Sequence, residues 1–103
     1  MKYTLIIRPQ AEADLAEAYA WYEDKRRGLG YDFLLQVEAG MKYIERMAET
    51  HPINYRGTRQ HLIKRFPYKI VYIVEHKAAV VLAVIHGKRS PESLKDRIER
   101  VGF

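Results

Sequence analysis

The sequence RFPYKIVYIVEHKAAVVLAVIHGKRSP, from Arg65 to Pro91, contains two runs rich in Val, Ile and Tyr. Such side chains suit a pleated, packed surface, so the runs predict two adjacent strands, Tyr68–Glu75 and Ala79–His86, joined by the polar break His76-Lys77. Every residue from Ala79 to Ile85 is apolar. Both faces of the second strand should therefore be covered, and the pair should form the centre of a sheet.

Basic and imidazole side chains crowd the ends of these two strands. They are Lys64, Arg65, His86, Lys88 and Arg89. A strand end can hold a side chain rigidly at a surface. We therefore expect the chemistry or recognition of this protein to lie there.

Length and composition indicate one domain. A chain of 103 residues is near the commonest domain size and can bury a single core. The absence of cysteine excludes disulfides and thiolate metal sites, and no stretch is typical of a signal peptide or membrane helix. We expect a single domain over residues 1–103 that is soluble and cytoplasmic and uses no cofactor or metal.

The net charge of +5 is unevenly distributed along the chain. Residues 1–55 carry 7 Lys and Arg against 9 Asp and Glu, a net charge of −2, whereas residues 56–103 carry 11 against 4, a net charge of +7. If the C-terminal half forms one face, that face attracts a polyanion or an acidic protein partner. The alternative is a solvated basic surface that serves solubility alone.

The N-terminal half predicts one strand and two helices. Lys2–Arg8 alternates with period two, and Pro9 suits the first turn of a helix. Over Gln10–Arg27 apolar residues recur at helical spacing, and Gly28-Leu29-Gly30 ends that helix. The short link requires the next helix to lie antiparallel as a hairpin. The apolar seam of this second helix contains Leu34, Val37, Met41, Ile44 and Ala48.

The C-terminal half completes the sheet and adds a last helix. His61–Phe66 predicts a short strand, which Pro67 separates from the next strand by a tight antiparallel turn. Ser90 suits the N-cap of the last helix and Pro91 suits its first position. This helix either packs on the domain or detaches to engage a partner. Its narrow apolar edge contains Leu94, Ile98 and Val101.

The predicted order is strand, helix, helix, strand, strand, strand, helix. It gives an α+β domain in which a helical hairpin is laid on one face of a small, mostly antiparallel, four-stranded sheet (β-α-α-β-β-β), followed by a short C-terminal helix.

Four motifs give the chain a resemblance to a known family. They are AxADLxEAxxWYE (Ala11–Glu23), GLGxxFL (Gly28–Leu34), RFPYKIVY (Arg65–Tyr72) and VIHGKRSP (Val84–Pro91). In this order and spacing they resemble the RelE/ParE toxin superfamily, and more narrowly its ParE-like plasmid-stabilisation branch in bacterial type II toxin–antitoxin modules. The match spans almost the whole chain.

The resemblance implies a toxin that inhibits growth and a cognate antitoxin whose C-terminal segment wraps and neutralises it. ParE-like members act on DNA gyrase, whereas RelE-like members cut messenger RNA in the ribosomal A site without a metal. We therefore expect a gyrase-directed toxin, with a ribosome-dependent endoribonuclease as the alternative. A second alternative is a non-toxic basic domain of the same fold that binds nucleic acid or protein.

These alternatives point to different residues. For RNA cleavage, His86 would act as acid or base, with His61 on the neighbouring strand as a second proton-transfer group. The phosphate would be held by Lys64, Arg65 and Arg89. A gyrase-directed toxin would instead bind its target through exposed residues of the last helix and its approach, namely Arg89, Lys95, Arg97 and Arg100.

Some of the same residues have structural interpretations. His86 would hydrogen-bond the backbone at its strand end, and Arg89 would pair with Glu92 or Asp96. On the first helix, Tyr22 lies on the apolar stripe and is predicted to be core. Contacts with the antitoxin are expected at Trp21, which is offset from that stripe and half exposed, and on the strand face of Tyr68 and Tyr72, which is either core or a groove.

Overall fold

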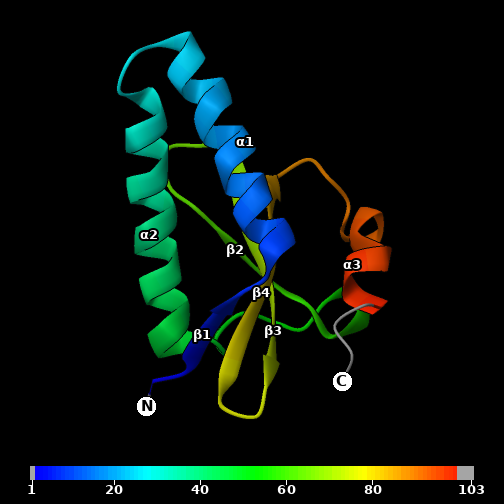
Figure 1. Cartoon of the computed structure of the whole chain (residues 1–103). Coiled ribbons are helices and arrows are strands. Elements are labelled where there is room, and N and C mark those ends of the chain that lie inside the picture. The colour runs from blue at the N-terminus through cyan, green and yellow to red at the C-terminus, as the bar shows by residue number, and fades with distance from the viewer. Residues whose placement is uncertain (1, 100–103) are drawn as a thin grey trace.

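The computed structural model describes residues 2–99. The chain forms a four-stranded sheet, a long helical hairpin and a short C-terminal helical segment (Figure 1). The elements are β1 (Thr4–Ile7), α1 (Pro9–Lys25), α2 (Leu29–Met47), the 3-10 turn η1 (Tyr55–Gly57), β2 (Arg59–Leu62), β3 (Tyr68–Glu75), β4 (Ala78–His86), the 3-10 turn η2 (Pro91–Leu94) and α3 (Lys95–Glu99). The predicted α+β architecture and element order are confirmed.

The sheet is mixed, with strand order β1-β4-β3-β2. Strands β2, β3 and β4 form an antiparallel meander, and β1 adds to β4 in parallel. Parallel neighbouring strands need a long connection. Here the helical hairpin and the strands β2 and β3 together connect β1 to β4. The last β1 pair joins Ile7 to Val81, so the β1-facing edge of β4 is not paired with a strand beyond that point.

The helical hairpin depends on two glycines. Gly28 has φ +89°, a left-handed conformation that suits glycine, and the Glu23 carboxylate accepts hydrogen bonds from the backbone N–H groups of Gly28 and Gly30 at 2.9 and 3.0 Å. A Cβ on Gly30 would lie 2.8 Å from the Tyr19 carbonyl oxygen. The two helices therefore approach to backbone contact at this point.

The main core lies between the hairpin and one face of the sheet. Four of the five residues predicted for the α2 seam are buried, but Leu34 is 36% exposed and its neighbour Phe33 is fully buried in its place. The prediction for Leu34 was wrong because the first turn of α2 rotates Phe33 toward the aromatic residues of the core. Tyr72 is also fully buried and donates a 2.7 Å hydrogen bond to the Ala48 carbonyl.

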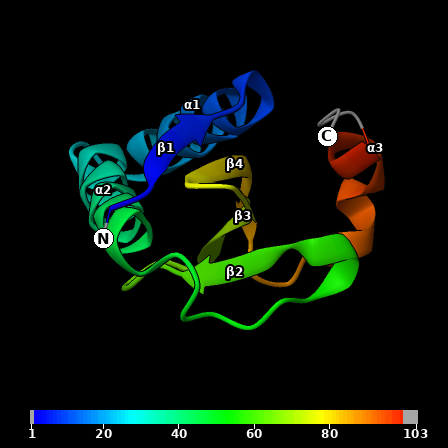
Figure 2. The ribbon, with the colours of Figure 1, turned by 90° about the horizontal axis from the view of Figure 1, so that it is seen from below.

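A second, smaller core lies on the opposite face of the sheet, where η2 and α3 pack (Figure 2). Leu94 is buried against residues of β3 and β4, and Ile98 packs on the edge of the same cluster. Ser90 is the N-cap, as predicted, because its side chain accepts a hydrogen bond from Glu92 N. The last helix therefore packs on the domain, and β4 is covered on both faces. Val101 lies outside the described residues.

The turn between β2 and β3 is longer than predicted. Strand β2 is Arg59–Leu62, so the predicted strand His61–Phe66 is right only at His61 and Leu62. Arg65 has φ +70°, and the N–H of Ile63 bonds to the carbonyl of Tyr68 across the turn. Ile63 and Phe66 remain buried although they are not in a strand. Burial and secondary structure therefore do not coincide in this turn.

Strand β4 contains a β-bulge at Leu82. Val71 pairs with Ala83 but Tyr72 pairs with Val81, so Leu82 has no partner in β3. An extra residue reverses the alternation of faces. As a result, Val81 and Val84 both face the helical hairpin, whereas Ala83 faces the second core.

Among residues 2–99, no helix combines the length and the apolar character that a membrane span requires.

Candidate functional site

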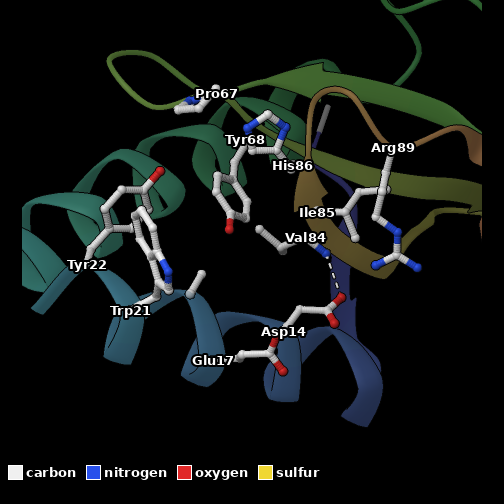
Figure 3. A pocket seen from close by; sticks show the side chains of 11 residues that line it. Asp14, Glu17, Trp21, Tyr22, Pro67, Tyr68, Val84, Ile85, His86 and Arg89 are labelled. Carbon is white, nitrogen blue, oxygen red and sulfur yellow. Dashed lines mark hydrogen bonds between the residues drawn. The ribbon is translucent and has the colours of Figure 1, made fainter. Parts of the chain in front are cut away.

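A pocket of about 580 Å³ opens between α1 and the adjoining ends of β3 and β4. Residues of α1 form one wall, including Asp14, Glu17 and Trp21 (Figure 3). The opposite wall contains Tyr68 and His86. The pocket lies beside the edge of β4 that β1 leaves unpaired.

Aromatic rings line the inner part of the pocket. Tyr22 packs against Phe33, Phe66 and Tyr68 with ring centroids 5.2, 4.9 and 6.0 Å away, as expected for a core residue. Trp21 is 56% exposed and its ring meets Tyr22 edge-on. Lys25 Nζ lies 4.6 Å from the centroid of the Trp21 ring. The pocket thus has an aromatic interior and one large aromatic side chain at its mouth.

The face of β3 that carries Tyr68 and Tyr72 is part pocket and part core. Tyr68 lines the pocket and is half-buried. Tyr72 lies on the same face but contributes no accessible surface, because the hairpin covers it and Ala48 accepts its hydroxyl hydrogen. The prediction of Tyr72 as an antitoxin contact is therefore wrong, while Tyr68 and Trp21 are accessible.

An ion pair joins α1 to α3 at the Asp14 end of the pocket. Arg97 donates to both oxygens of Asp14, with Nη1 to Oδ2 at 2.6 Å and Nη2 to Oδ1 at 3.0 Å. Asp14 Oδ2 also accepts from Val84 N at 3.0 Å, and Arg97 Nη1 donates to the carbonyl of Leu82 at 3.3 Å. The side chains are 24% exposed for Arg97 and 15% for Asp14. The pair thus satisfies one backbone group of the bulged residue, Leu82, and one of Val84, which follows it.

This geometry corrects the role predicted for Arg97. The charge pattern of the last helix suggested a target-binding side chain, but the guanidinium is committed to Asp14, whose hydrogen bond raises the pKa of Arg97. Lys95 is exposed, as predicted. Arg100 lies outside the described residues. Sequence reasoning missed Asp14 as a partner because the two residues are 83 positions apart.

Two turns bring the predicted basic residues to one end of the sheet. The N–H of Gly87 donates to the Pro67 carbonyl at 2.7 Å, which ties the β4–η2 turn to the β2–β3 turn. The buried Lys69 ammonium donates to the carbonyl of Arg89 at 2.9 Å, and burial lowers the pKa of Lys69. Exposed side chains at this end are Lys64, Arg65, Lys88 and Arg89. Lys69, which orders the second turn, was not predicted as part of the site.

His86 and Arg89 have local partners. The ring of His86 packs edge-on against Tyr68 with centroids 5.6 Å apart, and its Nδ1 accepts from Lys88 N at 3.1 Å. This contact agrees with the structural interpretation of His86. Arg89 Nε donates to Ser93 Oγ at 3.2 Å rather than to Glu92 or Asp96, so the predicted ion pair is not formed.

His61 belongs to a separate cluster on the other side of β3. Its Nδ1 lies 2.9 Å from His51 Nε2, and its ring stacks on Tyr43 with centroids 4.9 Å apart. Burial lowers the pKa of His61, and the neighbouring His51 and Lys64 lower it further. The site does not bring His61 together with His86, because β2 is the far edge strand while His86 ends β4.

Comparison with known proteins gives a consistent family assignment. The family model described as the ParE toxin of the type II toxin–antitoxin system parDE matches residues 5–91. A chain from the chromosomal ParDE toxin–antitoxin system of P. aeruginosa superposes with a TM-score of 0.74 and 19% identity, covering 82% of this chain and 96% of that one. A chain from the RelBE2 toxin–antitoxin complex of Mycobacterium tuberculosis has a TM-score of 0.57 and 21% identity, covering 84% and 92%.

A search of curated proteins gives no match. The two solved structures share the fold, and the family model covers most of the chain, including the α1 and β4 segments that build the pocket. The chain therefore belongs to the ParE toxin family of type II toxin–antitoxin systems.

Proposed function

We propose that the protein inhibits bacterial growth by binding DNA gyrase and that a cognate antitoxin neutralises it by covering the pocket end of the sheet. Family membership supports the toxin role and the antitoxin partner. The choice of gyrase rests on the site, which favours binding over cleavage.

The observation that carries this choice is the separation of the two imidazoles. Metal-independent RNA cleavage needs one group to activate the 2′-OH and another to protonate the leaving oxygen. His86 has no second imidazole beside it, because His61 lies on β2, on the other side of β3, where its ring is hydrogen-bonded to His51. The Glu17 carboxylate also lines the pocket that His86 lines, and its negative charge disfavours a phosphate backbone.

Target binding is assigned to the exposed cations Arg89 and Lys95, which flank η2. Exposed cations of this kind set the association rate and specificity for an acidic protein surface. We leave Arg97 out of this proposal because its guanidinium is paired with Asp14.

The test is a supercoiling assay with purified protein, relaxed plasmid, gyrase and ATP. The wild-type chain should block supercoiling, and the charge reversals Arg89→Glu and Lys95→Glu together should weaken inhibition by about tenfold or more. Lys42→Glu makes the same charge change at an exposed position on α2 and serves as the matched control. Undisturbed supercoiling by wild-type protein would refute the proposal.

A ribosome-dependent endoribonuclease is the second candidate. It is favoured by the hydrogen bond between Gly87 and Pro67, which gathers Lys64 and Arg65 on one turn with His86 and Arg89 on the other. Controlled expression followed by mapping of transcript ends separates the candidates. Cuts within translated codons that disappear in folded His86→Ala and Arg65→Ala variants would support cleavage. Filamentation with intact transcripts would support gyrase, and normal growth would indicate a non-toxic domain.

A further inference from the structure

The pocket beside α1 combines aromatic walls with a carboxylate that no other side chain neutralises. Trp21 and Tyr68 lie on facing walls, and Glu17 lies on α1 between Trp21 and Asp14 (Figure 3). Within residues 2–99, Glu17 makes neither an ion pair nor a side-chain hydrogen bond, whereas Asp14 is held by Arg97 and Val84. Glu17 is therefore available to a ligand.

The Tyr68 hydroxyl faces the carboxylates of α1 across the pocket. It has no hydrogen-bond partner in the described part of the chain, and it points toward α1 (Figure 3). Burial raises the pKa of Tyr68, and the negative charges of Glu17 and Asp14 raise it further because they disfavour the phenolate. The α1 side of the pocket is thus electronegative, in a chain whose net charge is +5.

Aromatic faces with an adjacent carboxylate suit an alkylammonium or guanidinium group. The Trp21 ring already accepts one cation, Lys25, from the next turn of α1. At the far side of the pocket Arg89 repels a cation. A ligand cation should therefore lie at the Glu17 end, with its apolar stem against Val84.

We propose that this pocket binds an arginine or lysine side chain carried by an extended segment of the antitoxin, with the cation between Trp21 and Tyr68 and paired with Glu17. The inference rests on the proposed function, which supplies the antitoxin as partner. A segment anchored in the pocket also covers His86 and Arg89 on the opposite wall. Occupation of the pocket therefore blocks the target-binding end of the sheet, which fits an antitoxin better than the target.

The experiment uses capped dipeptides as probes and the full chain as receptor. The protein is made by cell-free synthesis with ¹⁵N label and titrated with N-acetyl-Leu-Arg-amide, N-acetyl-Leu-Gln-amide and N-acetyl-Leu-Glu-amide. Trp21 is the sole tryptophan, so its indole N–H gives a single assigned signal. Glu17→Gln removes the carboxylate charge, and Glu12→Gln makes the same change at an exposed position of α1 that does not line the pocket.

The Leu-Arg probe should shift the Trp21 indole signal saturably with a Kd of about 1 mM. The Leu-Gln probe should bind about fivefold more weakly, because it loses both the ion pair and the cation–π contact. Glu17→Gln should weaken Leu-Arg binding about threefold, because it removes only an exposed ion pair. Glu12→Gln should leave the affinity unchanged. Equal binding of Leu-Arg and Leu-Gln, preference for Leu-Glu, or no shift at Trp21 would overturn the inference.

The titration contains neither antitoxin nor gyrase, so its outcome is independent of the supercoiling assay. Failure of the dipeptides alone would refute the cation pocket and leave the toxin proposal standing. Failure of the supercoiling and growth assays alone would refute the toxin proposal and leave a cation pocket whose natural partner is not an antitoxin.

Discussion

The ion pair between Asp14 and Arg97 should make a large contribution to stability, and a double-mutant cycle can measure it. Asp14→Asn keeps an oxygen for the hydrogen bond from Val84 N, and Arg97→Met keeps most of the apolar stem. Each single change removes the charge pairing between the two side chains. The cycle therefore isolates the energy of the pair from that of the backbone contacts.

The magnitude follows from geometry and burial. Two charge-assisted hydrogen bonds, at 2.6 and 3.0 Å, join side chains that are 15% and 24% exposed. Breaking a buried pair leaves an uncompensated charge and costs about 3–5 kcal/mol, whereas an exposed pair contributes about 0.2–1 kcal/mol. For this mostly buried pair we expect a loss of about 2–3 kcal/mol for Arg97→Met and a coupling energy of about 1.5–2 kcal/mol.

Urea unfolding followed by circular dichroism and by Trp21 fluorescence gives the four free energies of unfolding. The pair Arg56–Glu99 is the control, because its atoms are 3.4 Å apart and its side chains are 45% and 47% exposed. Its cycle should give less than about 0.5 kcal/mol. If the Asp14–Arg97 coupling is no larger than that of the control, the reasoning from burial is refuted.

Three further predictions concern stability. Burial and neighbouring positive charge lower the pKa of His61 from its ordinary value of 6.5, so just below that pH the unfolded chain binds more protons than the folded one. The contribution of His61 to stability should therefore be complete above pH 6.5 and fall as the pH drops. His61→Gln should flatten the pH profile of chemical denaturation. Tyr72→Phe leaves the Ala48 carbonyl without its donor and should lower the free energy of unfolding by about 1–1.5 kcal/mol. The control Tyr43→Phe, which removes an exposed hydrogen bond to Thr50, should cost less than about 0.5 kcal/mol, and equal losses would contradict this. Gly30→Ala places a methyl group 2.8 Å from a backbone oxygen of α1 and should lower the free energy of unfolding by about 2 kcal/mol or more. In the control Gly87→Ala the methyl group lies 3.5 Å from the Pro67 oxygen, so thermal denaturation should show almost no change in stability.

Local patterns predicted the elements well because each pattern reports a nearby physical requirement. The bounds of β3, Tyr68–Glu75, were predicted correctly because β-branched and aromatic residues fill the strand and polar residues end it. The error at Leu34 concerns which face of the helix is buried, and the error at the β2 terminus concerns buried residues that are not in a strand. Phe33 displaces Leu34 from the core, and Ile63 is buried without being in a strand.

The candidate site was less predictable because its contacts join distant parts of the chain. The basic strand ends were correctly grouped from sequence, since strand order places their turns together. The commitment of Arg97 to Asp14 and the burial of Tyr72 under the hairpin depend on tertiary packing. Charge pattern and strand alternation alone contain no information on either contact.

The bulge at Leu82 has a consequence for how the sheet keeps its alignment. Every residue of β4 from Ala78 to Ile85 is apolar. A shift of the bulge to another position in the strand would therefore replace one apolar side chain by another in the core without exposing a polar group. The contacts that fix the bulge lie outside the strand. A carboxylate on α1 accepts a hydrogen bond from Val84 N, and a guanidinium on α3 donates to the carbonyl of the bulged residue, Leu82. The apolar side chains of β4 therefore need not specify the register of the strand. Two charged residues at opposite ends of the chain, Asp14 and Arg97, specify it instead.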